Sequence, residues 1–296
     1  MSYHSIVLVK QVPDTANISG EVMKPDGTVN RGKLPAVFNP EDKVALELAL
    51  QVKERYGGTV TAITMGPPKA SDLLRECLFM GADEVCLITD RKFAGADTLA
   101  TSYVLSETIK KFAPYDFIFA GRQAIDGDTA QVGPQTAEKL GVPQVTYAEE
   151  VLEVKKKSVI IKRRIDGGNE TLKSVMPVLI TVIKEAAAPR PFKAKLAMAY
   201  KNAKSLLEIE KMTDSNPLLI LDDLIEEYKT QGLFIPTLTT DDLNVDVERC
   251  GISGSPTKVH KIESVVLAGG EHEKIEPDKE GLGYLVDKLM EDHIFG

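Results

Sequence analysis

The sequence lacks several features that would point to particular classes of protein. It has no tryptophan and only three cysteines, Cys77, Cys86 and Cys250, which form no CxxC pair. We therefore expect buried free thiols rather than a disulfide framework or a zinc knuckle. No apolar run approaches the roughly 18 residues that a membrane span needs. The start of the chain has no secretory signal pattern, which predicts a cytoplasmic protein.

Nucleotide and catalytic fingerprints are missing as well. The chain contains neither GxGxxG nor GxxxxGK[ST], which argues against a Rossmann dehydrogenase or a P-loop NTPase. It also lacks GxSxG and HExxH, and its four histidines are scattered, so nothing supports a hydrolase or a metal site. With 44 acidic against 36 basic side chains the net charge is -8. Nucleic acid is therefore not an expected partner.

What the chain does contain is a regular alternation of strand-like and helix-like segments. The β-rich runs are Ser5–Val12, Thr59–Met65, Asp83–Thr89, Tyr115–Gly121 and Val142–Thr146. Helical patterns lie between them, at Pro40–Gly57, Ser71–Met80, Thr98–Phe112 and Thr129–Leu140, with Asn39, Ser71 and Asp97 as the expected caps of the first three. This order predicts an α/β fold with a doubly wound, mostly parallel sheet.

The pattern changes after the fifth run. Val151–Ile183 alternates with a period of two residues and turns at Gly167–Gly168, which predicts an added antiparallel β section. Beyond Pro189 the core patterns are weak, with helices expected near Leu218–Gln231 and Gly281–His293. We expect residues 1–190 to form a nucleotide-binding domain and residues 191–296 to form an extended arm over a partner.

Two loops are candidates for ligand binding, because a doubly wound sheet binds ligands at the carboxyl ends of its strands. One is Lys10–Asp14, after the first strand, and the other is Gly121–Val132, after the fourth. The second leads into a helix, whose free N–H groups suit a phosphate or pyrophosphate. In the alternative interpretation Asp126, Asp128 and Thr129 only cap that helix, and spacing does not decide between the two.

Several motifs together carry a resemblance to a known family. They are LVKQVPD near the start, NPED at Asn39–Asp42, GADTLATS at Gly95–Ser102, GRQAIDGDTAQVGPQTAEKLGVPQVT at Gly121–Thr146, IDGGNETL at Ile165–Leu172 and the segment Thr239–Val259. The sequence resembles the β subunit of electron-transferring flavoproteins over about Ser5–Arg190, and again over the last of these segments. The resemblance implies an adenine-nucleotide-binding type of fold.

The resemblance also implies cofactors and partners. Such a β subunit pairs with an α subunit that carries a mobile FAD. In the simpler members the β subunit holds AMP, and in the electron-bifurcating members a second FAD. A bifurcating member takes electrons from NADH and sends them to ferredoxin and, through the α-subunit FAD, to a partner dehydrogenase. An acyl-CoA dehydrogenase is the first choice here, and a flavin-dependent 2-hydroxy-acid dehydrogenase is also compatible. The redox chemistry belongs to the cofactor, and no catalytic residue is expected.

Carried over residue by residue, the resemblance assigns the nucleotide site to the ends of the strands, the NPED motif and the Gly121–Val132 loop. The residues are Leu8, Val9, Asn39, Asp42, Met65, Asp97, Thr98, Thr101, Gly121, Arg122, Gln123, Ala124, Ile125, Asp126, Gly127, Asp128, Thr129, Ala130, Gln131 and Val132. Partner docking falls to the basic stretch Lys193–Lys204, with Leu196 as its apolar anchor.

The GADTLATS stretch, Arg122 and GSPTKV resemble the bifurcating type, in which Asp97 and Thr98 face the extra flavin and Arg122 tunes it. Asp97 could also be an ordinary helix cap. Two other functions remain open: a non-bifurcating subunit with structural AMP, and a nucleotide-binding regulatory module of the same winding. One departure from the family is Leu206–Pro236, which is longer than the usual linker at this place.

Overall fold

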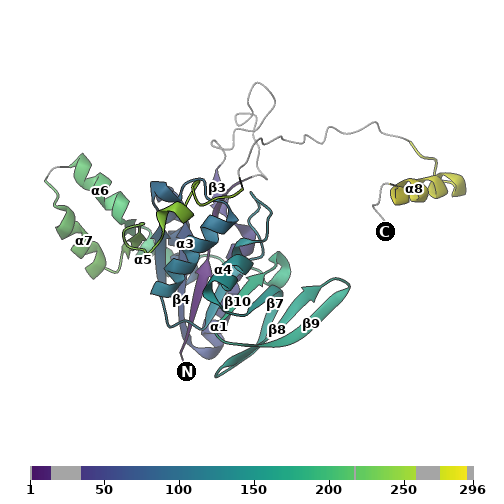
Figure 1. The fold of residues 1–296 in the computed structure, drawn as a ribbon, viewed down its shortest axis with the longest axis horizontal. Coiled ribbons are helices and arrows are strands. Elements are labelled where there is room, and N and C mark those ends of the chain that lie inside the picture. The colour runs from purple at the N-terminus through teal and green to yellow at the C-terminus, as the bar shows by residue number, and fades with distance from the viewer. Residues whose placement is uncertain (1, 15–34, 217, 258–273, 292–296) are drawn as a thin grey trace.

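The computed structural model describes residues 2–14, 35–216, 218–257 and 274–291. Lys258, Val259 and His293, which belong to segments named above, lie outside these ranges. A nine-stranded sheet forms the centre of the described part, with the strand order β13-β5-β4-β1-β6-β10-β7-β8-β9 (Figure 1). This confirms the predicted α/β class with a mostly parallel sheet.

The parallel part of the sheet is built from β1 (Tyr3–Leu8), β4 (Gly58–Met65), β5 (Glu84–Ile88), β6 (Phe117–Gly121) and β10 (Val178–Val182). One face packs against α1 (Pro40–Tyr56) and α2 (Ser71–Met80), and the other against α3 (Thr98–Lys111) and α4 (Val132–Leu140). Phe117 and Phe119 point into the first core, and Ile118 into the second. Both faces are covered, so the strands are continuous apolar runs.

The antiparallel section consists of β7 (Gln144–Lys155), β8 (Ser158–Ile165) and β9 (Gly168–Val175). The predicted turn at Gly167–Gly168 joins β8 to β9. β10, which we expected to belong to this section, lies between β6 and β7 and runs parallel to both. The prediction was wrong there, because a short apolar run carries no signal for which neighbours it pairs with.

Several element boundaries also differ from the prediction. The first run splits into β1 and the short β2 (Gln11–Pro13), which pairs with β3 (Ala36–Phe38). Ala70, not Ser71, is the N-cap of α2, because a 3-10 turn precedes that helix. α4 begins at Val132, three residues later than expected, and leaves Thr129 in the loop.

The chain after residue 190 contains short elements. They are α5 (Ala194–Tyr200), β11 (Lys204–Ser205), α6 (Leu206–Ser215), α7 (Leu221–Thr230), β12 (Phe234–Ile235), β13 (Thr237–Leu238) and α8 (Lys279–Glu291). β13 extends the main sheet beside β5, while α8 stands apart from the sheet (Figure 1). In the ranges that the structure describes, no helix is both long and apolar enough to cross a membrane.

Candidate nucleotide site

A cavity of about 1150 Å³ opens at the carboxyl ends of β1, β4, β5 and β6. This is the edge of a doubly wound sheet where ligands bind. Of the residues assigned to the nucleotide from the sequence, all but Asn39, Ile125 and Asp126 line this cavity. The fold therefore brings together residues that are more than 100 positions apart in the sequence. Their contacts with a nucleotide remain a prediction.

The loop between β6 and α4 has an unusual backbone. Asp128 and Ala130 adopt left-handed conformations, with φ of 48° and 53°, although neither is glycine. Such conformations cost free energy and gather at functional sites, and successive N–H groups in turns of this kind form anion-binding concavities. Both residues line the cavity.

The start of α4 bears on the alternative that the loop merely caps this helix. The N-cap is Gln131, and no side chain accepts a hydrogen bond there. Asp126 instead pairs with Lys10 at 2.8 Å, and Asp128 accepts a hydrogen bond from the Gln123 side chain. The acidic residues of the loop therefore do not cap α4, and no side chain caps its first N–H groups.

The NPED motif at the start of α1 holds the two loops of the site by hydrogen bonds. The Asn39 amide donates to the Gln123 carbonyl at 2.9 Å and accepts from the Ile125 N–H at 3.2 Å. Asp42 accepts from the N–H groups of Lys10 and Gly121, at 2.9 and 3.0 Å. The start of α1 thus fixes both loops that line the cavity. Asn39 is fully buried and makes no side-chain cap to α1, so its local structural role is to hold the loop.

Asp42 is a buried carboxyl in the wall of the cavity. Burial raises its pKa to about 7, although hydrogen bonds from Asn39, Gly121 and Lys10 act in the opposite direction. A Cβ on Gly121 would lie 2.4 Å from Asp42 Oδ1. Glycine is therefore required at the end of β6 for the loop to approach α1 this closely.

Arg122 reaches from the same loop to α1. Its guanidinium bonds the Glu41 carboxylate at 2.9 Å and lies over the Tyr147 ring, with Cζ 5.7 Å from the ring centroid. Glu41 also accepts from the Gln123 N–H at 2.8 Å. Neither Glu41 nor Tyr147 was assigned to the site from the sequence. The position of Glu41 inside the NPED motif could have indicated its role, whereas no sequence pattern indicated a role for Tyr147.

Asp97 is the N-cap of α3, as the sequence predicted. One carboxylate oxygen accepts from the N–H groups of Leu99 and Ala100, and the other from Thr257 N–H at 3.1 Å. Burial would raise its pKa, but these backbone hydrogen bonds outweigh it, and the pKa of Asp97 is lowered. Ser255 Oγ accepts from the Asp97 N–H at 2.8 Å. Asp97 therefore ties the residues at 255–257 to the cavity wall, and its role toward a flavin stays a prediction.

The cavity has further walls that the sequence analysis missed. Pro67, Asp90 and Arg91 follow the ends of β4 and β5, so the rule of strand ends could have found them. Leu207 and Asp241 come from the segment after residue 190, and no sequence pattern indicated that they approach the same cavity. The cavity thus extends from α3 and α4 across to the start of α6.

Comparisons with known proteins identify the family of this chain. The family model of the electron transfer flavoprotein domain matches residues 26–211. The electron transfer flavoprotein subunit beta of Clostridium acetobutylicum is 44% identical over 288 residues, which cover 97% of this chain and 98% of that protein. The chain belongs to the electron transfer flavoprotein family.

Two more relatives of this family match almost from end to end. The acryloyl-CoA reductase electron transfer subunit gamma of Anaerotignum propionicum is 42% identical over 302 residues, covering 97% of this chain and 98% of its own. Subunit CarD of the caffeyl-CoA reductase-Etf complex of Acetobacterium woodii is 39% identical over 291 residues, covering 98% of each chain. The resemblance to β subunits of the family is confirmed.

The basic stretch Lys193–Lys204, to which the resemblance assigns partner docking, contains the helix α5. Leu196, the expected anchor, is half-buried on α5, whereas Met198 is 65% exposed on the same helix. Arg75 donates to the Ala203 carbonyl beyond the end of α5 at 2.7 Å, and Lys193 N–H donates to the Phe79 carbonyl before its start. The docking role of Leu196 stays a prediction, and Met198 presents more apolar surface.

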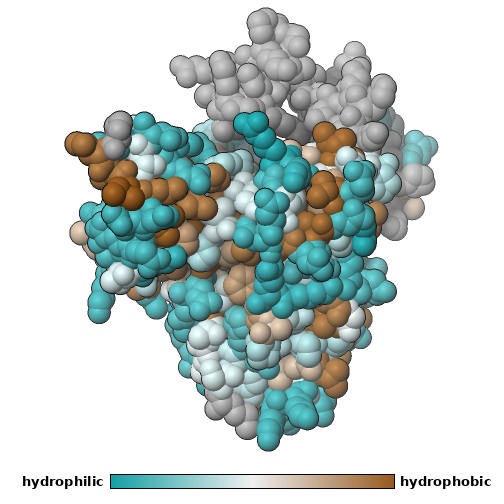
Figure 2. All heavy atoms as spheres, turned by 60° about the vertical axis from the view of Figure 1, so that its left-hand side comes forward, coloured by the Kyte–Doolittle hydropathy of each residue, from teal (hydrophilic) through white to brown (hydrophobic). Residues whose placement is uncertain are grey.

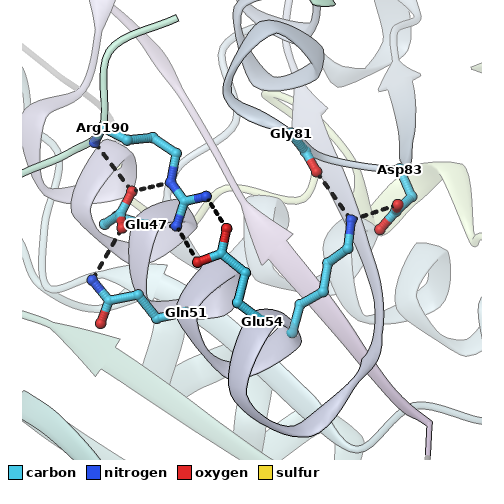
Figure 3. Close-up of polar contacts among 7 residues, drawn as sticks. Glu47, Gln51, Glu54, Gly81, Asp83 and Arg190 are labelled. Atoms are coloured by element: carbon cyan, nitrogen blue, oxygen red, sulfur yellow. Dashed lines mark hydrogen bonds and ion pairs between the residues drawn. The ribbon is translucent and has the colours of Figure 1, made fainter. Parts of the chain in front are cut away.

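Figure 3 shows how the chain is held just before α5. Arg190 bonds Glu47 through its backbone N–H and its guanidinium, and also pairs with Glu54, both on α1. Burial would raise the pKa of Glu47, but hydrogen bonds from Arg190 and Gln51 lower it overall. Because Glu47 is buried, this ion pair fixes the path by which the chain leaves the sheet.

Proposed function

We propose that this chain is the β subunit of an electron-bifurcating electron transfer flavoprotein, and that FAD binds in the cavity. In this role the complex takes electrons from NADH. It passes them to ferredoxin and, through the FAD of the α subunit, to a flavin-dependent partner of the acyl-CoA dehydrogenase or reductase type. FAD supplies the electron-transfer chemistry when it is bound.

The size and extent of the cavity carry this proposal. Small-molecule pockets commonly enclose roughly 300–1,000 Å³, and about 1150 Å³ is more than a mononucleotide needs. The cavity continues from the loop at Asp128 past Thr98 to Leu207. This extent suits a dinucleotide, with the diphosphate near the loop and a second ring system beyond it.

The residues of the cavity fit such a ligand. The N–H groups at Thr129–Val132 suit the diphosphate, whereas that of Asp128 already donates to the Ala124 carbonyl. Thr101 offers a hydroxyl for a ribityl chain, and the Thr98 hydroxyl, which donates to the Gln131 side chain, can still accept a hydrogen bond. Arg122 adds a cation at the same wall, able to stabilise negative charge on a reduced flavin. Both carboxylate oxygens of Asp97 accept hydrogen bonds from backbone N–H groups, which reduces the repulsion between this anion and a diphosphate.

The non-bifurcating alternative places AMP in the same cavity. The loop and the bracing by Asn39 and Asp42 would serve AMP equally well. AMP would not fill the part of the cavity lined by Leu207 and Asp241, which is why we prefer FAD. A regulatory nucleotide-binding module is disfavoured by membership of the family.

For the partners, we propose that residues 191–296 lie across the α subunit in the cytoplasm. Helix α8 supports this, because it buries none of its residues and exposes Leu282, Leu285, Val286 and Met290. An apolar helix face of this kind is typical of a protein contact. The two relatives named after acryloyl-CoA and caffeyl-CoA reductases support a partner of the acyl-CoA type.

The proposal is tested by counting ligands in the purified αβ complex. We expect two FAD and no AMP per αβ pair, and NADH should reduce one of the flavins in a stopped-flow experiment. A complex with one FAD and one AMP, in which NADH reduces no flavin even after FAD is added, would establish the plain carrier instead.

A further inference from the structure

The strand β7 carries an irregularity next to the cavity. Its pairing with β10 shifts between Ile180 and Val182, so that two residues of β7 lie opposite Thr181. Tyr147 lies in this bulge with a φ of 58°. A left-handed conformation is rare for a bulky side chain and persists only where the surroundings determine it.

The bulge is not explained by packing of the Tyr147 ring into a core. Tyr147 is 39% exposed and belongs to neither core cluster. Its backbone N–H donates to Thr181 Oγ1 at 3.3 Å, which holds the irregular backbone in place. The strained conformation therefore directs an exposed ring, and bulges commonly serve to re-aim a side chain.

The ring is directed at Arg122. The Arg122 backbone N–H donates to the Val182 carbonyl at 2.8 Å, which sets the start of its side chain beside the bulge. Its guanidinium then lies between the Glu41 carboxylate at 2.9 Å and the face of the Tyr147 ring. Arg122 lines the cavity, whereas Tyr147 does not.

We infer that Tyr147 is a positioning residue, which acts on the nucleotide ligand by holding the Arg122 guanidinium at the wall of the cavity. Glu41 fixes the guanidinium from one side by charge, and the ring fixes it from the other by a cation–π contact. The inference rests on the proposed function in one respect, namely that the ligand is FAD.

A double-mutant cycle tests the inference, with FAD and AMP titrated separately into the αβ complex after its nucleotides have been removed. We expect Arg122→Ala to weaken FAD binding by at least about tenfold and Tyr147→Ala by about fivefold. The double variant should bind FAD as Arg122→Ala does, within about twofold, because Tyr147 has no other route to the ligand. Tyr147→Phe keeps the ring and should stay within about threefold of the wild type.

Two further variants separate positioning from folding. Leu152→Ala is the matched control, because Leu152 lies on the same strand and is 40% exposed, and it should not change FAD affinity. Tyr147→Gly tolerates the left-handed backbone and should melt at a higher temperature than Tyr147→Ala, yet lose the same affinity. A Tyr147→Gly variant that binds FAD like the wild type overturns the inference, and so do additive effects in the cycle.

Different outcomes contradict the proposed function and the role of Tyr147. If the wild-type complex takes AMP but no second FAD, the proposed function is wrong. The same cycle with AMP then decides the role of Tyr147: coupling between Tyr147 and Arg122 supports it, and independent or absent effects overturn it.

Discussion

The helices that cover the parallel sheet and the helices after residue 190 differ in how many of their residues are buried. α1 buries ten of its residues, from Glu41 to Val52, whereas α5, α7 and α8 bury none. Figure 2 shows hydrophobic residues on the side formed by α6 and α7. Leu218, in the connection between these two helices, is 90% exposed. Extensive burial stabilises the first region, whereas the second contributes fewer buried residues, such as Ile235 and Leu243, and relies in addition on caps and ion pairs.

The difference follows from the two tasks. The cavity needs residues from distant parts of the chain at fixed positions, and a buried parallel sheet supplies that rigidity. The second region joins the first through β13, which pairs with β5, and through a few buried residues such as Ile235 and Leu243. Polar contacts add to this, including Arg190 on α1 and the capping box of Ser205 and Glu208. Apolar surface left exposed between such points is available to other proteins.

The largest effect on folding should come from the sheet. Phe117 is fully buried on β6, beside the rings of Tyr3 and Phe119. We expect Phe117→Ala to lower the free energy of unfolding by about 3–5 kcal/mol, measured by urea denaturation. Leu285→Ala on α8 should cost less than about 0.5 kcal/mol in the same chain. Equal losses would show that α8 packs as tightly as β6.

The contrast also explains what could be predicted from the sequence. The parallel strands and α1 were found because doubly buried strands and an amphipathic helix leave clear apolar patterns. The position of β10 could not be found, since pairing depends on tertiary context. α6 was missed although Ser205 and Glu208 form a readable capping box, because its short apolar pattern is weak.

For the site, the strand-end rule and the resemblance located most of the cavity. They did not reveal that Asn39 and Asp42 brace the loops through hydrogen bonds. Such a role depends on contacts between residues about 80 positions apart, which no local pattern encodes. The same holds for Tyr147, whose conformation arises from strand pairing.

The second largest effect on folding stability is expected at the junction between the sheet and the segment after residue 190. Glu47→Gln should lower the free energy of unfolding by roughly 2–3 kcal/mol at neutral pH, because it weakens charged hydrogen bonds to Arg190. The folded-state pKa of Glu47 lies below its ordinary value of 4.5, so the stabilisation is present above that pH and is lost as the pH falls further.

Denaturation curves between pH 7 and pH 3 check this. The difference between the wild type and Glu47→Gln should shrink on acidification. Glu153→Gln, at a pair in which both partners are half exposed, should differ by less than about 1 kcal/mol at every pH. A difference for Glu47→Gln that stays constant down to pH 3 would contradict the assignment of this ion pair.

In the loop between β6 and α4 we expect a substitution to have a smaller effect on folding stability and a large effect on nucleotide binding. Thr129 is exposed and does not cap α4, so Thr129→Leu should change the free energy of unfolding by no more than about 0.5 kcal/mol. The larger apolar side chain should nevertheless weaken nucleotide binding at least about tenfold, because it obstructs the N–H groups of the loop. Thr171→Leu on β9 is the exposed control. Normal nucleotide affinity in Thr129→Leu would return the loop to a purely structural role.

The smallest effect on folding should come from α5, where the two apolar residues separate stability from docking. Met198→Ser should leave the melting temperature unchanged, since the side chain is mostly exposed. Leu196→Ser should lower it, because Leu196 is half-buried on the side of α5 that approaches Gly81. If an exposed anchor governs docking, Met198→Ser should lower the rate of electron transfer from the αβ complex to its dehydrogenase several-fold when the concentration of the complex is limiting. Leu196→Ser should lose rate only near its lowered melting temperature. The reverse result, a stable Leu196→Ser complex that no longer docks, would return the anchor to the residue that the sequence resemblance selects.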